Sequence, residues 1–208
     1  MSPKLESDPL WVSLQAELLR EICHDLRGRA MAMRGFAELQ NLAESDAGSA
    51  GLRLPVSEVA KVEALAKDLE TVNGPSRVEE PELLVLGPEV ERAARAVARL
   101  GDRRVTPVIV EPPLGDPSAV RVPPASFRRL VMVALVELGG AAREVADAEV
   151  RVRVERGEGE GEVRVALRTS AAALGAPARP DLLVAWTGAT WQWRADEDGS
   201  ELQLAFSA

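Results

Sequence analysis

The chain has 208 residues and a formal net charge of −8, which argues against nucleic acid as its main partner because phosphate binding depends on lysine and arginine. It holds one cysteine and one histidine, too few for an intramolecular disulfide or for a metal site built from these residues. The longest apolar run, residues 130–138, is too short to cross a bilayer, and no signal-peptide pattern opens the sequence. We therefore expect a cytoplasmic protein without a membrane partner.

The N-terminal part of the sequence predicts two helices joined by a turn. Apolar residues recur every three to four positions from Leu10 to Ala43 without an intervening proline, which is typical of one long helix. A small, polar turn follows at residues 44–51, and Pro55 suits the start of a second helix that ends at the Asn-Gly-Pro signal of residues 73–75. Two such helices cannot bury their apolar stripes alone, so we expect a homodimer that forms a four-helix bundle.

The composition changes after residue 75, and an α+β segment follows a short acidic linker at residues 76–81. We expect helices at residues 88–100 and 125–145, the second of them buried. Strand-like alternation predicts extended segments at residues 105–110, 121–122, 149–156, 162–169, 190–194 and 202–206. The predicted fold class is α+β: a helical hairpin over residues 1–75, then a domain over residues 76–208 in which helices cover one face of a mixed sheet.

His24 lies on the polar side of the first predicted helix. At about 100° per residue it falls opposite the apolar stripe, among charged neighbours, so its imidazole should face solvent. An exposed imidazole can accept a phosphoryl group on one ring nitrogen while Asp25 or Glu21 orients the ring or takes a proton. Arg20 or Arg27 is placed to steady the phosphate oxygens. The alternative is that His24 is an ordinary surface residue among charges.

The helix around His24 resembles the H-box helix of sensor histidine kinases. Residues 21–39 read EICHDLRGRAMAMRGFAEL, and they match the family in the His-Asp-Leu-Arg order and in the Arg-Gly-Phe-Ala-Glu-Leu tail. Gly28 stands where the family has Asn or Thr, and Arg29 stands where it has Pro. The resemblance implies that His24 is the phosphoacceptor. The change at residue 28 argues against the family's autokinase and phosphatase activities, and the missing proline predicts a straighter helix.

The order of elements from about residue 83 onward is similar to the ATP-binding domain of the GHKL superfamily, but its nucleotide site departs from the family in three places. The two polar N-box positions map to Glu137 and Ala141, so the Asn that holds Mg²⁺ is missing. The Asp-x-Gly-x-Gly box maps to residues 168–172, RTSAA, and the glycine-rich lid shrinks to residues 171–179. Transfer from ATP needs Mg²⁺ and positioned phosphates together. We therefore expect no cofactor or metal site, and absent or very weak autokinase activity.

This combination of a hairpin with a degenerate ATP-binding domain resembles the dimeric bacterial histidine phosphotransferases. The resemblance implies a phosphotransferase that moves a phosphoryl group between response-regulator receiver aspartates through His24, without ATP. In this reading Asp25 or Glu21 orients the imidazole, Arg27 assists phosphate binding, and the receiver supplies its own Mg²⁺. The residues expected to dock the receiver are Arg20, Gly28, Met31 and Ala32.

The same residues are also compatible with a second function. A pseudo-histidine-kinase scaffold would bind a receiver domain or a partner sensor histidine kinase without becoming phosphorylated. The departures at Gly28 and Arg29 favour the scaffold, whereas the intact pair of His24 and Asp25 favours the phosphotransferase.

Overall fold

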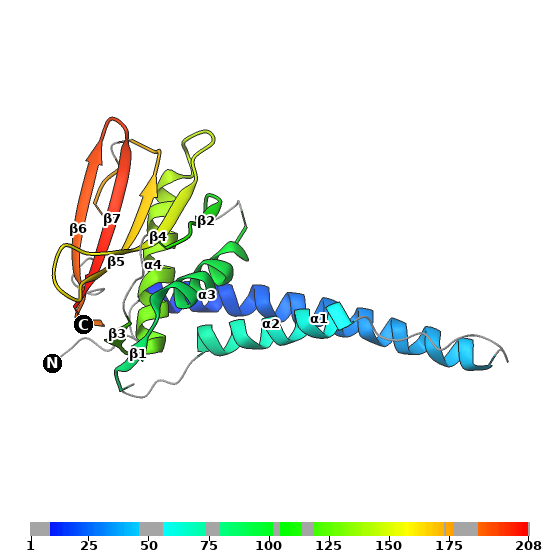
Figure 1. Ribbon diagram of the computed structural model, residues 1–208. Coiled ribbons are helices and arrows are strands. Elements are labelled where there is room, and N and C mark those ends of the chain that lie inside the picture. Colours follow the sequence, from blue (N-terminus) through cyan, green and yellow to red (C-terminus); the bar gives the residue numbers. More distant parts are fainter. Residues whose placement is uncertain are drawn as a thin grey trace.

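The computed structural model describes residues 9–45, 56–73, 80–101, 105–113, 119–172, 174–176 and 187–207. The N-terminal part is a hairpin of two helices, α1 (Pro9–Ser45) and α2 (Val56–Asn73). They run antiparallel, and the far half of α1 projects away from the rest of the molecule (Figure 1). The two predicted helices are confirmed, while most of the expected turn, linker and lid lies outside the described residues.

The described residues of the C-terminal part form two further helices, α3 and α4, and two sheets. Its elements in chain order are β1 (Glu82–Leu84), α3 (Leu86–Ala98), β2 (Val108–Val110), β3 (Val120–Val122), α4 (Pro124–Ala142), β4 (Val150–Arg156), β5 (Val163–Thr169), β6 (Thr190–Asp196) and β7 (Gly199–Phe206). The larger sheet has the order β2-β4-β5-β7-β6, and the smaller one pairs β1 with β3.

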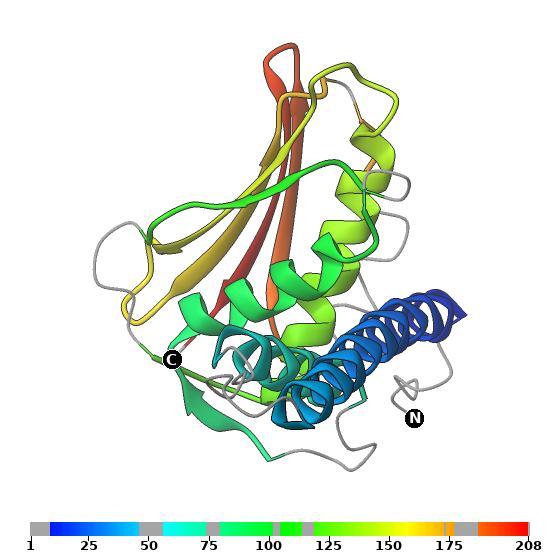
Figure 2. The ribbon, with the colours of Figure 1, turned by 90° about the vertical axis from the view of Figure 1, so that its right-hand side faces the viewer.

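The larger sheet is mixed, because β2 runs parallel to β4 while all other neighbours are antiparallel. Helices α3 and α4 cover one face of this sheet, and its other face is open (Figure 2). On β7 every second side chain is buried, which is the pattern expected when one face of a strand packs on a core. The structure therefore confirms the predicted α+β class with helices on one face of a mixed sheet.

Several element boundaries differ from the predicted ones. Helix α3 begins at Leu86, two residues before the expected start at Pro88, because proline is tolerated in the first turn of a helix. Strand β2 is limited to Val108–Val110, and β7 begins at Gly199 because the tight hairpin pairs Asp196 directly with it. Helix α4 is largely buried, as expected. Among the described residues no helix combines the length and apolarity that crossing a membrane requires.

One continuous core joins the hairpin to the C-terminal part. The first half of α1 buries its apolar stripe on α2 and α4, and the buried side chains are Trp11, Leu14, Leu18 and Ile22. The guanidinium of Arg129 on α4 lies 5.2 Å from the ring of Trp11, a cation–π contact across this seam. The premise that both stripes need a second chain is therefore wrong for the first half of α1. On the far half of α1, apolar residues such as Leu39, which is 55% exposed, stay uncovered within the described part of the chain.

Candidate functional site

The His24 side chain projects from the middle of α1 into solvent, with 80% of its surface exposed. Its position follows from the helix itself, because Ile22 is fully buried and the polar side of α1 faces outward. The Nδ1 atom of His24 lies 3.8 Å from Oδ1 of Asp25, which is too long for a hydrogen bond. The predicted exposure of the imidazole is confirmed, and its Nε2 side is open to an incoming group.

Asp25 is held by an arginine from the C-terminal part of the chain. Nη1 of Arg99 donates a hydrogen bond of 2.7 Å to Oδ2 of Asp25. The same guanidinium donates from Nε, at 2.9 Å, and from Nη2 to Oδ2 of Asp68 on α2. The side chain of Asp68 is 3% exposed and that of Arg99 is 19% exposed. Arg99 thus joins α1, α2 and the C-terminal end of α3 beside the candidate phosphoacceptor.

Glu21, the other acid expected to orient the imidazole, pairs with a different residue. Its Oε1 lies 3.4 Å from Nη2 of Arg20, which is an exposed ion pair on the surface of α1. Arg27 is also exposed on α1, one turn beyond His24. The structure therefore places Asp25 next to His24, whereas Glu21 and Arg20 contact each other.

The residues expected to dock a partner lie along one exposed strip of α1. Gly28, Met31 and Ala32 are all exposed, and a side chain added at Gly28 would meet open space. Arg29 has a structural contact instead, because its Nη1 donates a 2.8 Å hydrogen bond to Oε2 of Glu58 on α2. Arg29 thus fastens the two helices of the hairpin where the H-box family has proline.

The sequence carries one signal for the Arg99 contact, which is the carboxylate of Asp68 on an apolar helix stripe. Asp68 lies between Leu65 and Val72 on the apolar stripe of α2, where a carboxylate must find a partner when it is buried. A charged residue on a buried stripe predicts an arginine or lysine nearby. The apolar stripe alone does not identify Arg99 as that partner, since Arg99 lies 31 residues from Asp68 in the sequence.

Small apolar residues pack beside the end of β5, next to residues 168–172. Ala171 packs with Ala142 and Ala148 in a small buried cluster, against which Leu174 rests. Ser200 fastens this segment, because its Oγ donates to the carbonyl of Ala171 at 3.0 Å. On α4, Glu137 is half-buried and Ala141 is exposed.

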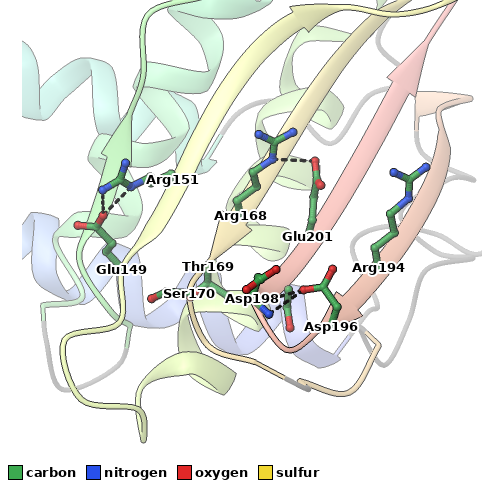
Figure 3. Close-up of a pocket in the computed structure, with 11 residues that line it drawn as sticks. Glu149, Arg151, Arg168, Thr169, Ser170, Arg194, Asp196, Asp198 and Glu201 are labelled. Carbon is green, nitrogen blue, oxygen red and sulfur yellow. Dashed lines mark hydrogen bonds and ion pairs between the residues drawn. The ribbon is translucent and has the colours of Figure 1, made fainter.

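An open depression of about 460 Å³ lies on the uncovered face of the larger sheet, at the ends of β4 to β7 (Figure 3). Its charged side chains largely satisfy one another, with Arg151 paired to Glu149 and Arg168 to Glu201. The Glu201 carboxylate raises the pKa of the Arg168 guanidinium, which stays charged. The helices, and with them the hairpin, lie on the other side of the sheet (Figures 2 and 3). This depression is therefore separate from the His24 site.

No metal site accompanies His24 in the described part of the chain. Within those ranges no group of three or more histidine, cysteine, aspartate or glutamate side chains is arranged to hold an ion.

No model of a protein family and no curated protein matches this sequence. Similar solved structures include histidine kinases and domains of histidine kinases. The histidine kinase domain of the blue-light-activated kinase EL346 of Erythrobacter litoralis is 18% identical, with a TM-score of 0.43, and the match covers 94% of this chain and 93% of that one. Histidine kinase AdeS of Acinetobacter baumannii is 14% identical, with a TM-score of 0.46 and coverages of 88% and 97%.

A third similar structure is histidine kinase ThkA in complex with the response regulator protein TrrA. It is 14% identical to this chain, with a TM-score of 0.47, and the match covers 94% of this chain and 62% of that one. Likenesses at this level concern the arrangement of a hairpin and an α+β domain. What the present chain does must follow from its own residues.

Proposed function

We propose that the chain is a histidine phosphotransferase of a two-component phosphorelay, which passes a phosphoryl group between receiver aspartates through His24. The observation that carries the proposal is the exposed imidazole of His24 beside the carboxylate of Asp25, within a helix that matches the H-box in four consecutive residues. A solvent-facing imidazole is accessible to a second protein, and an adjacent acid can support its nucleophilic role.

The reaction follows from this arrangement. Nε2 of His24 attacks the phosphorus of an aspartyl phosphate on the receiver, the N–P bond forms, and the acyl P–O bond breaks to release the receiver's carboxylate. The ring then carries an extra positive charge. The carboxylate of Asp25, near Nδ1, stabilises that charge or accepts the Nδ1 proton. Reversal of these steps delivers the phosphoryl group to a second receiver.

The energy for transfer comes from the incoming acyl phosphate, so the reaction needs no nucleotide. This agrees with the departures at Ala141 and residues 168–172 and with the alanine cluster around Ala171. Receiver-bound Mg²⁺ and the guanidinium of Arg27 would share the charge of the phosphoryl oxygens in the encounter complex. Gly28, Met31 and Ala32 would form a low docking floor on α1, since none of them carries a charge or a branched side chain.

The scaffold function remains the second candidate, and one observation favours it. Oδ2 of Asp25 accepts from Arg99 at 2.7 Å, whereas Oδ1 lies 3.8 Å from Nδ1 of His24, which is longer than a hydrogen bond. A partner receiver or sensor kinase would bind the same exposed strip in that case, without transfer.

The deciding experiment follows a phosphoryl group through the protein. A labelled, phosphorylated receiver is mixed with the chain and with a second receiver, and label on the second receiver is measured. We expect through-transfer with the wild type and a loss of at least about 10³-fold in rate with His24→Ala, since the nucleophile is removed. Cys23→Ser, at the exposed neighbouring position, is the matched control and should transfer normally.

Through-transfer that survives in His24→Ala would overturn the proposal. Binding of the receiver without any transfer by the wild type would favour the scaffold.

A further inference from the structure

Arg99 occupies a fixed position at the C-terminal end of α3. It caps that helix, with its backbone N–H bonded to the carbonyl of Ala96 at 3.2 Å. A cation is favourable there because the C-terminal end of a helix carries partial negative charge. The side chain leaves the C-terminal domain from this point and reaches both helices of the hairpin.

The burial of Asp68 determines where the guanidinium lies. A carboxylate that is 3% exposed requires a paired, hydrogen-bonding cation, and Nε and Nη2 of Arg99 supply one. The planar guanidinium has a rigid geometry, so these two bonds also fix the direction of Nη1. The third bond, from Nη1 to Oδ2 of Asp25, follows from that orientation.

This contact fixes the carboxylate next to the phosphoacceptor. Oδ2 of Asp25 accepts from Arg99, so Oδ1 remains as the oxygen near Nδ1 of His24. Asp25 is half exposed, and a carboxylate on a free surface would sample several rotamers. Arg99 therefore selects one of them.

We propose that Arg99 is a positioning residue for the phosphoacceptor: by holding Asp25, the C-terminal domain sets the carboxylate that supports the imidazole of His24. This assignment rests on the proposed phosphotransfer through His24. It gives the C-terminal domain a direct part in the chemistry of the hairpin.

The first test reads the environment of the imidazole without phosphotransfer. His24 is the only histidine, so ¹⁵N-histidine labelling of the full chain yields one pair of ring resonances. Arg99→Gln should shift these resonances, and Arg95→Gln, an exposed position one turn earlier on α3, should leave them at the wild-type values. Because Arg99→Gln leaves Asp68 buried without a cation, Asp68→Asn/Arg99→Gln is the second variant. This double variant leaves a neutral pair between the hairpin and the C-terminal domain, and its ring resonances should show the same shift.

A double-mutant cycle then separates a direct effect from one through Asp25. In an Asp25→Asn background Arg99→Gln should cause no additional shift, because the carboxylate it positions is gone. An equal shift in that background would overturn the assignment. The assignment would also be overturned if the ring resonances of both Arg99 variants superimposed on those of Arg95→Gln.

The second test is kinetic. With saturating phosphorylated receiver, Arg99→Gln and Asp68→Asn/Arg99→Gln should lower the maximal transfer rate roughly tenfold at unchanged KM, because a misplaced catalytic group slows the chemical step. Arg95→Gln should transfer normally. If both Arg99 variants transfer at the wild-type rate, the positioning role of Arg99 is overturned, while the proposed phosphotransferase function stands. A wild type that accepts no phosphoryl group would refute the proposed function, and the ring resonances would still decide whether Arg99 acts through Asp25.

Discussion

Arg29 on α1 makes an inter-helical contact at the position that is proline in the H-box helices that this segment resembles. The H-box family places proline here, which would remove a backbone donor and bend the helix. In this chain α1 continues without interruption for 37 residues, and the Arg29 guanidinium reaches Glu58 on α2. At this position α1 thus carries an inter-helical ion pair. It lies five residues from His24 and leaves the exposure of the imidazole intact.

Gly199 is a second residue whose identity the structure requires. It lies in the β6–β7 hairpin at φ +151°, and a Cβ there would collide with the carbonyl oxygen of Thr169. We expect Gly199→Ala to lower the free energy of unfolding by about 1–3 kcal/mol, measured by urea denaturation. Gly175→Ala is the control, since a Cβ at that position meets open space. Equal stability of the two variants would contradict this account of the hairpin.

At the scale of elements, a small charge network holds α1 and α2 together away from the domain. Glu58 on α2 accepts from Lys61 at 2.6 Å and from Arg29 at 2.8 Å. The Lys61 ammonium, and with it the Arg29 guanidinium, lowers the pKa of the Glu58 carboxyl. We therefore expect the pairing of the two helices to depend on pH.

The sign of that dependence follows from the lowered pKa. A carboxyl whose pKa is lower in the folded state stabilises the fold above its ordinary range, and this stabilisation is lost as pH falls through the lowered value. We expect the wild type to exceed Glu58→Gln in stability at neutral pH and to converge with it in acid. Thermal unfolding across a pH series measures this. Glu63→Gln, on the exposed side of α2, is the matched control. A difference that is constant with pH would contradict the prediction.

At the scale of the whole molecule, the two halves of the hairpin have different surroundings. The first half of α1 belongs to the common core, and the far half extends beyond the domain (Figure 1). Apart from the docking floor, exposed apolar residues gather on this far half of the hairpin: Leu39, Val56 and Val59. We propose that this surface pairs with a second copy of the chain, because a four-helix arrangement would cover both hairpins.

Charged substitutions on the far half test this pairing. We expect the wild type to sediment as a dimer and Leu39→Glu/Val59→Glu as a monomer, because a carboxylate cannot be buried unpaired in an apolar interface. Val145→Glu introduces the same charge at an exposed apolar position just after α4 and should remain dimeric. A monomeric wild type, or equal dissociation of the Val145 variant, would refute the dimer.

Much of this architecture was predictable because its signals are local. The helical period predicted α1 and α2, alternation predicted the long strands, and the wheel placed His24 on the solvent side. The seam between hairpin and domain was not predictable in the same way. A stripe shows that Leu14 and Leu18 are buried but not whether a second chain or α4 covers them. The partner of Asp25 was missed for the same reason, since Arg99 lies 74 residues away.

The central claim is that His24 accepts a phosphoryl group, and intact-mass spectrometry tests it most directly. The full chain is incubated with a phosphorylated receiver and quenched, and its mass is compared before and after mild acid treatment. We predict a gain of one phosphoryl group on the wild type and on Cys23→Ser that is lost in acid, stable in base and absent from His24→Ala. An unchanged mass while the receiver still binds, or a phosphoryl group that remains in His24→Ala, would contradict the claim.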